Sequence, residues 1–217
     1  MSTISKPRVK ICCISSIQEA ATAVRYGAAA LGLVSEMPSG PGVISEDEIA
    51  EIVATVPPPV STFLLTSKTT VEEVAGQVLR CRTHTVQIVD QFDEPYEDLR
   101  KAIPGVKIVQ VIHVSGERSV AEALSIASEV DALLLDSGNP ALETKELGGT
   151  GRVHDWAISR KIVDSARCPV FLAGGLNSGN VAQAIKAVRP FGLDLCSSVR
   201  TEGKLDESKL SDFFANI

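Results

Sequence analysis

The sequence predicts a (β/α)8 barrel, in which parallel strands and helices alternate around one core. Three observations lead to this prediction. Short runs of β-branched and leucine residues recur along the chain, amphipathic helical patterns fill the intervals, and glycine-rich segments follow the late runs. A doubly wound open sheet is the alternative, but it seldom carries eight such regular units. The 217 residues, of which 44% are hydrophobic, suffice for one sizeable core, so we expect a single domain over residues 1–217.

Each expected strand is a nearly continuous apolar run. A parallel sheet covered by helices buries both faces of its strands, so apolar and polar residues need not alternate along them. In chain order, the expected strands are Val9–Cys13, Ala30–Val34, Val60–Leu65, Thr85–Val89, Lys107–Val114, Ala132–Leu135, Pro169–Ala173 and Leu193–Cys196.

A helical pattern follows each of these runs, with apolar residues at the spacing of one helix face. Ser45 and Glu48 have the spacing of a capping box, which predicts the start of the second helix. Pro57–Pro59 suits a stiff connection from that helix to the third strand, so it marks no domain boundary. The expected helices are Ser16–Tyr26, Ser45–Val56, Thr70–Arg82, Pro95–Ala102, Ser119–Val130, Asp155–Ser165, Gly179–Val188 and Glu207–Ala215.

Composition restricts the class of partner. The net charge is −6, and the short basic clusters Arg80–Arg82 and Arg160–Lys161 have no aromatic neighbours, which argues against nucleic acid as a partner. No apolar run reaches the roughly 18 residues of a membrane helix, and the first residues lack the apolar stretch of a signal peptide. The five cysteines are an odd number, so we expect free thiols in a reducing cytoplasm.

The chemistry of such a barrel lies at the carboxyl ends of its strands. Cys12 and Cys13 close the first strand, and neighbouring side chains of a strand point to opposite faces, so only one thiol is expected to face the barrel mouth. A free cysteine is more often simply a buried apolar residue. Asp136 closes the sixth strand, where it suits either a proton donor or a cap of the following turn.

Glycines and hydroxyl residues follow the last three strands. Each glycine pair alone is compatible with an ordinary tight turn. Together, at the position where barrels bind phosphate through backbone N–H groups, they predict a phosphate cradle and a phosphorylated small-molecule substrate. The expected phosphate-binding residues are Gly149, Gly151, Gly174, Gly175, Ser197 and Ser198.

Several of these segments carry a family resemblance. The stretches "KICCI", "LLLDS", "GGTGRVHDW", "FLAGGLNSGNV", "GLDLCSSV" and "GKLD" resemble the loops of phosphoribosylanthranilate isomerase, an enzyme of tryptophan biosynthesis. The resemblance runs from the first strand to the last helix and is most specific in the carboxyl-terminal third. It implies a (β/α)8 fold, a monomer or homodimer, and the Amadori rearrangement of N-(5-phosphoribosyl)anthranilate without a metal or organic cofactor.

The resemblance also implies roles for individual residues. Carried over by position, Cys12 is the general base and Asp136 the general acid, with substrate-binding roles for Gly42, His113, Asn177 and Asp194. Lys10 is expected on the same strand face as Cys12, where its charge would lower the pKa of the thiol from about 8.5. Cys13, where the family usually has glycine, is expected to turn outward into the layer between strands and helices.

The chain departs from the family pattern in the half of the site that is expected to bind the aromatic acid. Gly42 stands where the arginine of "SPR" is expected to meet the anthranilate carboxylate, and "QLHG" has become Gln87–Asp90 without its histidine. Ser198 replaces a glycine and Arg200 an acid. His113, Arg118 and Arg200 are alternative sources of a compensating charge. Restoring the arginine at position 42 is expected to tighten binding, unless this glycine has a positive φ.

Three classes of function therefore remain open from the sequence. The first is an isomerase of phosphoribosylanthranilate or of a related amine with another aglycone. The second is a non-catalytic or regulatory barrel that binds a sugar phosphate. The third is another barrel enzyme such as an aldolase, which would need a lysine at the mouth, whereas Lys10 is expected to lie too deep.

Overall fold

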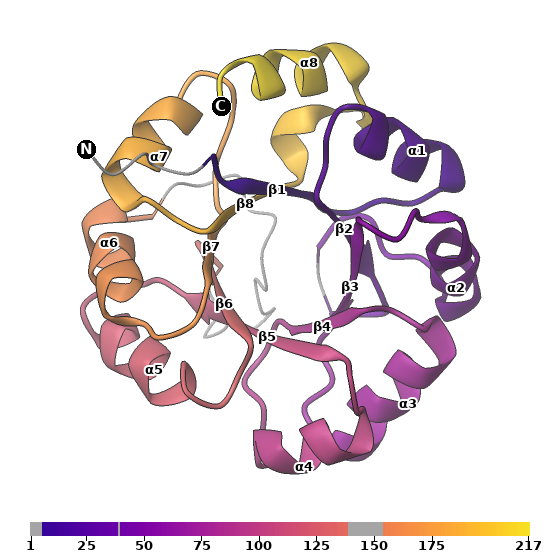
Figure 1. Ribbon diagram of the computed structural model, residues 1–217, viewed down its shortest axis with the longest axis vertical. Helices are drawn as coiled ribbons and strands as arrows, with labels where there is room; N and C mark the ends of the chain where they lie inside the picture. Colours follow the sequence, from indigo (N-terminus) through magenta and orange to yellow (C-terminus); the bar gives the residue numbers. More distant parts are fainter. Residues whose placement is uncertain (1–5, 39, 139–153) are drawn as a thin grey trace.

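The strands form a closed parallel barrel. The computed structural model describes residues 6–38, 40–138 and 154–217, and within them β1 to β8 pair in chain order, with β8 returning to β1 (Figure 1). The closed barrel excludes the open-sheet alternative. The strands are β1 (Arg8–Ile11), β2 (Ala30–Val34), β3 (Ser61–Thr66), β4 (Thr85–Ile88), β5 (Lys107–His113), β6 (Ala132–Asp136), β7 (Val170–Leu172) and β8 (Gly192–Leu195).

A helix follows every strand and covers the outside of the barrel (Figure 1). All expected strands and helices are present, and the largest difference is at α5, which ends at Ile126 rather than Val130. The helices are α1 (Ile17–Arg25), α2 (Glu46–Thr55), α3 (Val71–Cys81), α4 (Tyr96–Ala102), α5 (Arg118–Ile126), α6 (Trp156–Ser165), α7 (Val181–Val188) and α8 (Glu207–Ala215).

Three short elements after β8 were not expected. They are the 3-10 helix η1 (Ser197–Val199) and the antiparallel pair β9 (Arg200–Thr201) and β10 (Lys204–Leu205). The turn between β9 and β10 contains Glu202 and Gly203, both with positive φ, at 49° and 78°. This conformation joins adjacent antiparallel strands through a two-residue turn. The hairpin extends the connection from η1 to α8.

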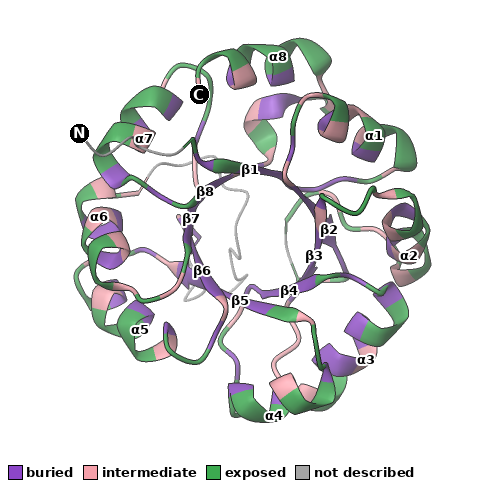
Figure 2. Cartoon of the chain, in the orientation of Figure 1, coloured by how far each residue is buried: buried purple, intermediate pink, exposed green. Residues whose placement is uncertain are grey.

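The core has two parts, one between the barrel and the helices and one inside the barrel. Every residue of β2, β4 and β6 is buried, as expected of strands covered on both sides (Figure 2). The inner cluster contains Phe63, Val109, Leu134 and Phe171 together with Cys12 and Cys13. A filled barrel interior places the open space at its mouth.

Local sequence signals explain how the helices begin. The Glu48 backbone N–H donates to Ser45 Oγ at 3.2 Å, and the Ser45 N–H donates to the Glu48 carboxylate at 2.8 Å, which confirms the expected capping box. The prolines Pro57–Pro59 lie between the end of α2 and the start of β3, as expected of a short connection. Within the described part of the chain, no helix has the length and apolar character needed to cross a membrane.

Candidate active site

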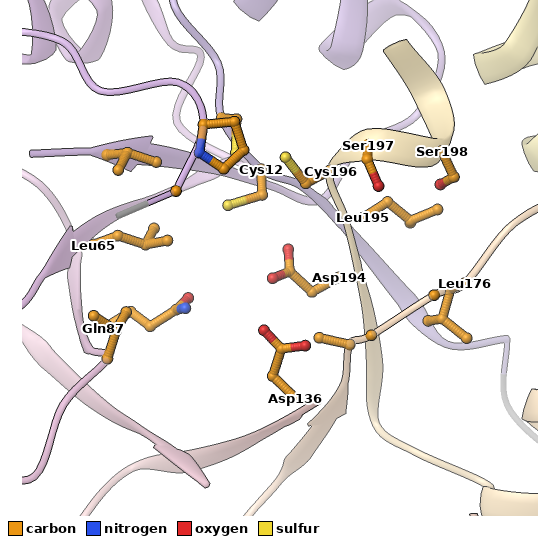
Figure 3. A pocket seen from close by; sticks show the side chains of 18 of the residues that line it. Cys12, Leu65, Gln87, Asp136, Leu176, Asp194, Leu195, Cys196, Ser197 and Ser198 are labelled. Atoms are coloured by element: carbon orange, nitrogen blue, oxygen red, sulfur yellow. The ribbon is translucent and has the colours of Figure 1, made fainter. Parts of the chain in front are cut away.

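A pocket opens at the carboxyl ends of the strands, where the sequence places the chemistry (Figure 3). Cys12 and Cys13 reach it from the end of β1, Asp136 from β6, and Asp194 from β8. The remaining lining residues are Val34, Met37, Gly40, Pro41, Leu65, Gln87, Val89, Ala173, Gly174, Gly175, Leu176, Leu195, Cys196, Ser197 and Ser198.

Lys10 lies inside the barrel on the same side as Cys12. A β-carbon built on Gly32 would lie 2.8 Å from Cys12 Sγ and 3.0 Å from Lys10 Nζ, so both side chains reach the same point of β2. The Lys10 ammonium is fully buried, lies 2.8 Å from the Asp194 carboxylate and sits 5.5 Å from the centre of the Phe63 ring. The expected shared face of Lys10 and Cys12 is confirmed, and Lys10 is not among the residues that line the pocket.

The surroundings favour a thiolate at Cys12. A hydrogen bond from the Cys13 thiol lowers the pKa of Cys12; burial opposes this shift, and the charge of Lys10 reinforces it. Burial disfavours a charged lysine, but Asp194 and the neighbouring thiols outweigh it and raise the pKa of Lys10. Lys10 therefore keeps its positive charge close to Cys12, which is only 4% exposed.

The expectation that Cys13 turns outward is wrong. β1 ends at Ile11, so the alternation of side chains along a strand no longer applies to Cys12 and Cys13. Cys13 has a φ of 61°, in the left-handed region, and both cysteines line the pocket. Hydrogen bonds to the thiols of Cys12 and Cys196, together with burial, raise the pKa of Cys13. Cys13 is thus a protonated donor beside Cys12.

Gly42 has no room for a side chain. Its φ is 78°, which confirms the positive φ considered from the sequence, and a β-carbon on it would lie 2.5 Å from Cys13 Cβ and 3.0 Å from Cys13 Cα. Its neighbours Gly40 and Pro41 line the pocket, whereas Gly42 does not. The Cys13 side chain therefore excludes an arginine from position 42 in this backbone conformation.

The expected phosphate residues after β7 and β8 meet at one side of the pocket. Gly174 and Gly175 have φ values of 81° and 63°, which glycine adopts without strain. Ser197 and Ser198 begin η1, and the Ser198 hydroxyl oxygen is buried with no hydrogen-bond partner among the described residues. Gly149 and Gly151 lie outside the described residues.

Asp136 faces the interior of the pocket, together with Asp194 (Figure 3). Its carboxylate also accepts a hydrogen bond of 2.7 Å from the Ser137 backbone N–H, so the turn-capping role considered from the sequence is present as well. Asp136 is 8% exposed and lines the pocket. Cys12 and Asp136, the expected base and acid, thus line one hollow.

Besides Gly42, two further expected substrate-binding residues lie outside the pocket lining. Asn177 shapes the turn after β7: its Oδ1 accepts from the Gly179 N–H at 2.9 Å, and its Nδ2 donates to the Gly175 carbonyl at 3.2 Å. His113 lines a separate groove with Tyr96 and Glu122, and its Nε2 lies 2.9 Å from the Val89 carbonyl oxygen.

The other two candidate cations are also absent from the pocket lining. Arg118 begins α5, and Arg200 forms an ion pair with Glu19. Sequence reasoning therefore named no cation that lines the pocket.

Sequence reasoning missed Gln87 and Cys196. Gln87 is buried in β4 and lines the pocket, and its side-chain oxygen has no partner among the described residues. The signal for Gln87 was an amide side chain between the apolar residues Val86 and Ile88 of the strand. Over the described ranges, no three His, Cys, Asp or Glu side chains are grouped so as to bind a metal ion.

Comparison with known families gives an independent assignment. The family model of N-(5'-phosphoribosyl)anthranilate (PRA) isomerase matches residues 9–216. The chain belongs to the PRA isomerase family. The chain is 37% identical over 209 residues to N-(5'-phosphoribosyl)anthranilate isomerase 2 of Methanosarcina mazei, covering 95% of this chain and 92% of that protein. A relative from Methanocella arvoryzae is 34% identical over 206 residues, covering 94% and 93%.

Solved PRA isomerases share the architecture. The enzyme from Thermotoga maritima superimposes with a TM-score of 0.82 at 31% identity, covering 97% of this chain and 98% of that one. A further PRA isomerase, with a TM-score of 0.78, 29% identity and the same coverage, was solved with reduced 1-(o-carboxyphenylamino)-1-deoxyribulose 5-phosphate. These comparisons confirm the fold and the family that the sequence motifs of this chain imply.

Proposed function

We propose that the protein catalyses the Amadori rearrangement of N-(5-phosphoribosyl)anthranilate in tryptophan biosynthesis. The observation that carries this proposal is that Cys12, with its lowered pKa, and Asp136 line one pocket beside a cradle of glycines and hydroxyls. A base and an acid on one small-molecule site are what an aldose–ketose isomerisation requires. Family membership over residues 9–216 supports the same reaction.

In the proposed mechanism Asp136 donates a proton to the furanose ring oxygen. The bond from C1 to that oxygen breaks, and the nitrogen lone pair forms the C1=N bond of a protonated imine. The Cys12 thiolate then removes the C2 proton, and the C2–H electron pair forms a C1=C2 bond while the nitrogen recovers its lone pair. The resulting amino-enol tautomerises to the ketone. No oxidant or reductant is consumed.

The phosphate of the substrate is proposed to bind Gly174, Gly175, Ser197 and Ser198. Left-handed glycines turn backbone N–H groups toward a ligand, and the Ser198 hydroxyl is available as a further donor. Asp194 is proposed to act through Lys10, which it holds below Cys12.

A second candidate function concerns the aglycone, the part of the substrate that the phosphoribosyl group carries. Because Gly42 carries no side chain and Cys13 fills the adjacent space, the pocket lacks the arginine contact of the family at that position. An isomerase acting on a phosphoribosyl amine with another aglycone, or a sugar-phosphate-binding barrel without turnover, would share the remaining features. All five cysteines are free of disulfides, which supports a reducing cytoplasm as the proposed location.

The test is turnover with the purified protein. Phosphoribosylanthranilate is generated from anthranilate and phosphoribosyl pyrophosphate, and its loss is followed by fluorescence for the parent and for Cys12→Ser. Turnover that depends on Cys12, together with rescue of a tryptophan auxotroph lacking the isomerase, is the expected result. Absence of both, with inorganic phosphate still bound, would favour the non-catalytic barrel. Faster turnover of a phosphoribosyl amine with another aglycone would redirect the substrate assignment.

A further inference from the structure

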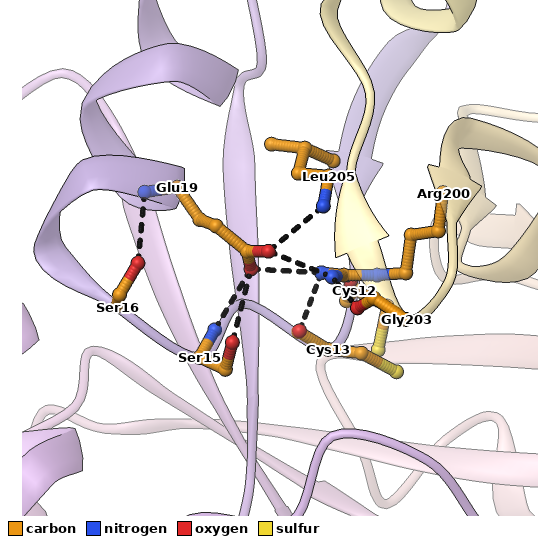
Figure 4. A network of polar contacts seen from close by, with 8 residues as sticks. All are labelled: Cys12, Cys13, Ser15, Ser16, Glu19, Arg200, Gly203 and Leu205. Carbon is orange, nitrogen blue, oxygen red and sulfur yellow. Dashed lines mark hydrogen bonds and ion pairs between the residues drawn. The ribbon is translucent and has the colours of Figure 1, made fainter.

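Arg200 forms a buried ion pair that the proposed mechanism does not use. Its side chain, 7% exposed, lies at the start of β9 and meets Glu19 of α1, whose side chain is 13% exposed (Figure 4). The two nitrogens Nη1 and Nη2 donate to the two carboxylate oxygens at 2.9 and 3.1 Å. This paired geometry restrains both side chains more strongly than a single contact does.

The same guanidinium holds the backbone that carries the proposed base. Arg200 Nη2 donates to the Cys12 carbonyl at 3.2 Å and to the Cys13 carbonyl, and Nη1 donates to the Gly203 carbonyl at 2.8 Å (Figure 4). These contacts connect the segment after β1 to the turn between β9 and β10. Nε is the one guanidinium nitrogen that has no partner among the described residues.

Glu19 is anchored on its other side. Its carboxylate accepts from the Ser15 backbone N–H at 3.1 Å and from the Leu205 N–H at 2.8 Å, while the Glu19 N–H donates to Ser16 Oγ (Figure 4). Although burial opposes ionisation, the bonds from Arg200 and from these backbone groups lower the pKa of Glu19. The carboxylate is thus charged, and it links the loop after β1 to β10.

The held segment has a backbone conformation that needs external support. Cys13 has a φ of 61°, and a non-glycine residue keeps such a conformation only where its surroundings fix it. Arg200 follows directly on η1, whose serines border the proposed phosphate site. Arg200 therefore joins the segment that follows the proposed cradle to the carbonyl groups of Cys12 and Cys13.

We infer that Arg200 and Glu19 are positioning residues that fix the Cys12 thiol relative to the phosphate cradle. This inference rests on the proposed function for its kinetic consequence. The two residues act on the backbone of Cys12 and Cys13 and do not touch the substrate. Their effect is to place the thiol at C2 of a sugar held by its phosphate, where a displacement of about 1 Å costs up to about a hundredfold in rate.

The test needs variants that leave no buried charge unpaired, because a lone buried carboxylate would destabilise the protein. Arg200→Met combined with Glu19→Gln removes both charges. Arg200→Lys keeps the positive charge but loses the planar guanidinium whose two nitrogens donate to the Glu19 carboxylate. The matched control is Arg25→Met with Glu207→Gln, which removes an exposed pair of 2.8 Å between α1 and α8. Melting temperature and circular dichroism establish that each variant folds.

Two readouts separate positioning from a purely structural role. The first is the split between kcat and KM for phosphoribosylanthranilate. The second is the pH dependence of iodoacetamide alkylation at Cys12, resolved from Cys13 by tandem mass spectrometry. The groups around Cys12 are Lys10 of β1, Asp194 of β8 and the Cys13 thiol, which shift its pKa, and Asp136, which lines the same pocket. None of these four groups is changed in the variants.

The expected result is a folded double variant whose kcat falls by about tenfold to a hundredfold with KM near the parent value. Its Cys12 alkylation midpoint moves to higher pH because Cys13 is no longer held in place to donate to the thiolate. Arg200→Lys recovers part of both effects, and the control changes neither. A folded double variant with unchanged kcat and unchanged midpoint, or one with a raised KM alone, would overturn the inference. If the parent lacks turnover, the proposed function fails, while the alkylation midpoint still tests the positioning.

Discussion

Gly42 lies directly against Cys13, so that a β-carbon at position 42 would come within 2.5 Å of Cys13 Cβ. At both positions the chain departs from the family pattern: Cys13 stands where the family usually has glycine, and Gly42 stands where it has arginine. The structure thus connects two replacements that look independent in the sequence.

The first prediction concerns this contact. Gly42→Arg alone is expected to destabilise the protein by about 1–3 kcal/mol, because the φ of 78° and the collision with Cys13 both oppose it. Adding Cys13→Gly removes the collision, so the double variant should be more stable than the sum of the single effects by about 0.5–3 kcal/mol. Urea unfolding of the four proteins measures the coupling. Additive effects would show that the two positions are independent.

The second prediction separates the two thiols. Cys12→Ser is expected to lower kcat by about a hundredfold or more, as for loss of a general base. Cys13→Ser keeps a donor beside Cys12 and should change kcat little, whereas Cys13→Ala removes the donor and should shift the kcat profile to higher pH. Steady-state rates between pH 6 and 9 provide the comparison. Equal losses in Cys12→Ser and Cys13→Ser would refute the assignment of the base.

The third prediction concerns alkylation of the unmodified protein. The pKa of Cys12 is lowered, so its thiolate forms at lower pH than that of an unperturbed thiol. Cys81 is an internal reference because burial raises its pKa to about 12. Iodoacetamide labelling across a pH series, quantified for each cysteine, should modify Cys12 at lower pH than Cys81. Cys12 labelling that begins only above pH 9 would contradict the thiolate.

The fourth prediction addresses the phosphate cradle. Ser198→Ala should weaken binding of inorganic phosphate and raise KM, because a hydrogen bond to a charged group contributes about 1.5–3 kcal/mol. Ser125→Ala, on the exposed face of α5, is the matched control. Isothermal titration with phosphate and competition with the substrate measure the change. Equal phosphate affinity in parent and Ser198→Ala would place the anion elsewhere.

Much of the barrel was predictable because its strands are continuously apolar and its helices carry one apolar face. The outward direction of Cys13 was not, since it depends on whether β1 ends at Ile11 or Cys13, and strand ends are poorly marked in a sequence. The contacts Gly42–Cys13 and Arg200–Glu19 exist only because the barrel brings distant segments together. The second contact joins residues that are 181 positions apart in the sequence. No local pattern specifies such contacts, whereas the glycines after β7 follow from local backbone geometry.

The contact of Arg200 with the carbonyl groups of Cys12 and Cys13 has a consequence for biosynthesis of the protein. A ribosome adds Cys12 near the beginning of translation and Arg200 near its end, so the proposed base has no fixed position through most of synthesis. The nascent chain therefore carries neighbouring thiols whose backbone Arg200 does not yet hold. The lowered pKa and the 4% exposure of Cys12 belong to the closed barrel, so a change in the pH dependence of its alkylation can report the meeting of the first and last strands in time-resolved experiments.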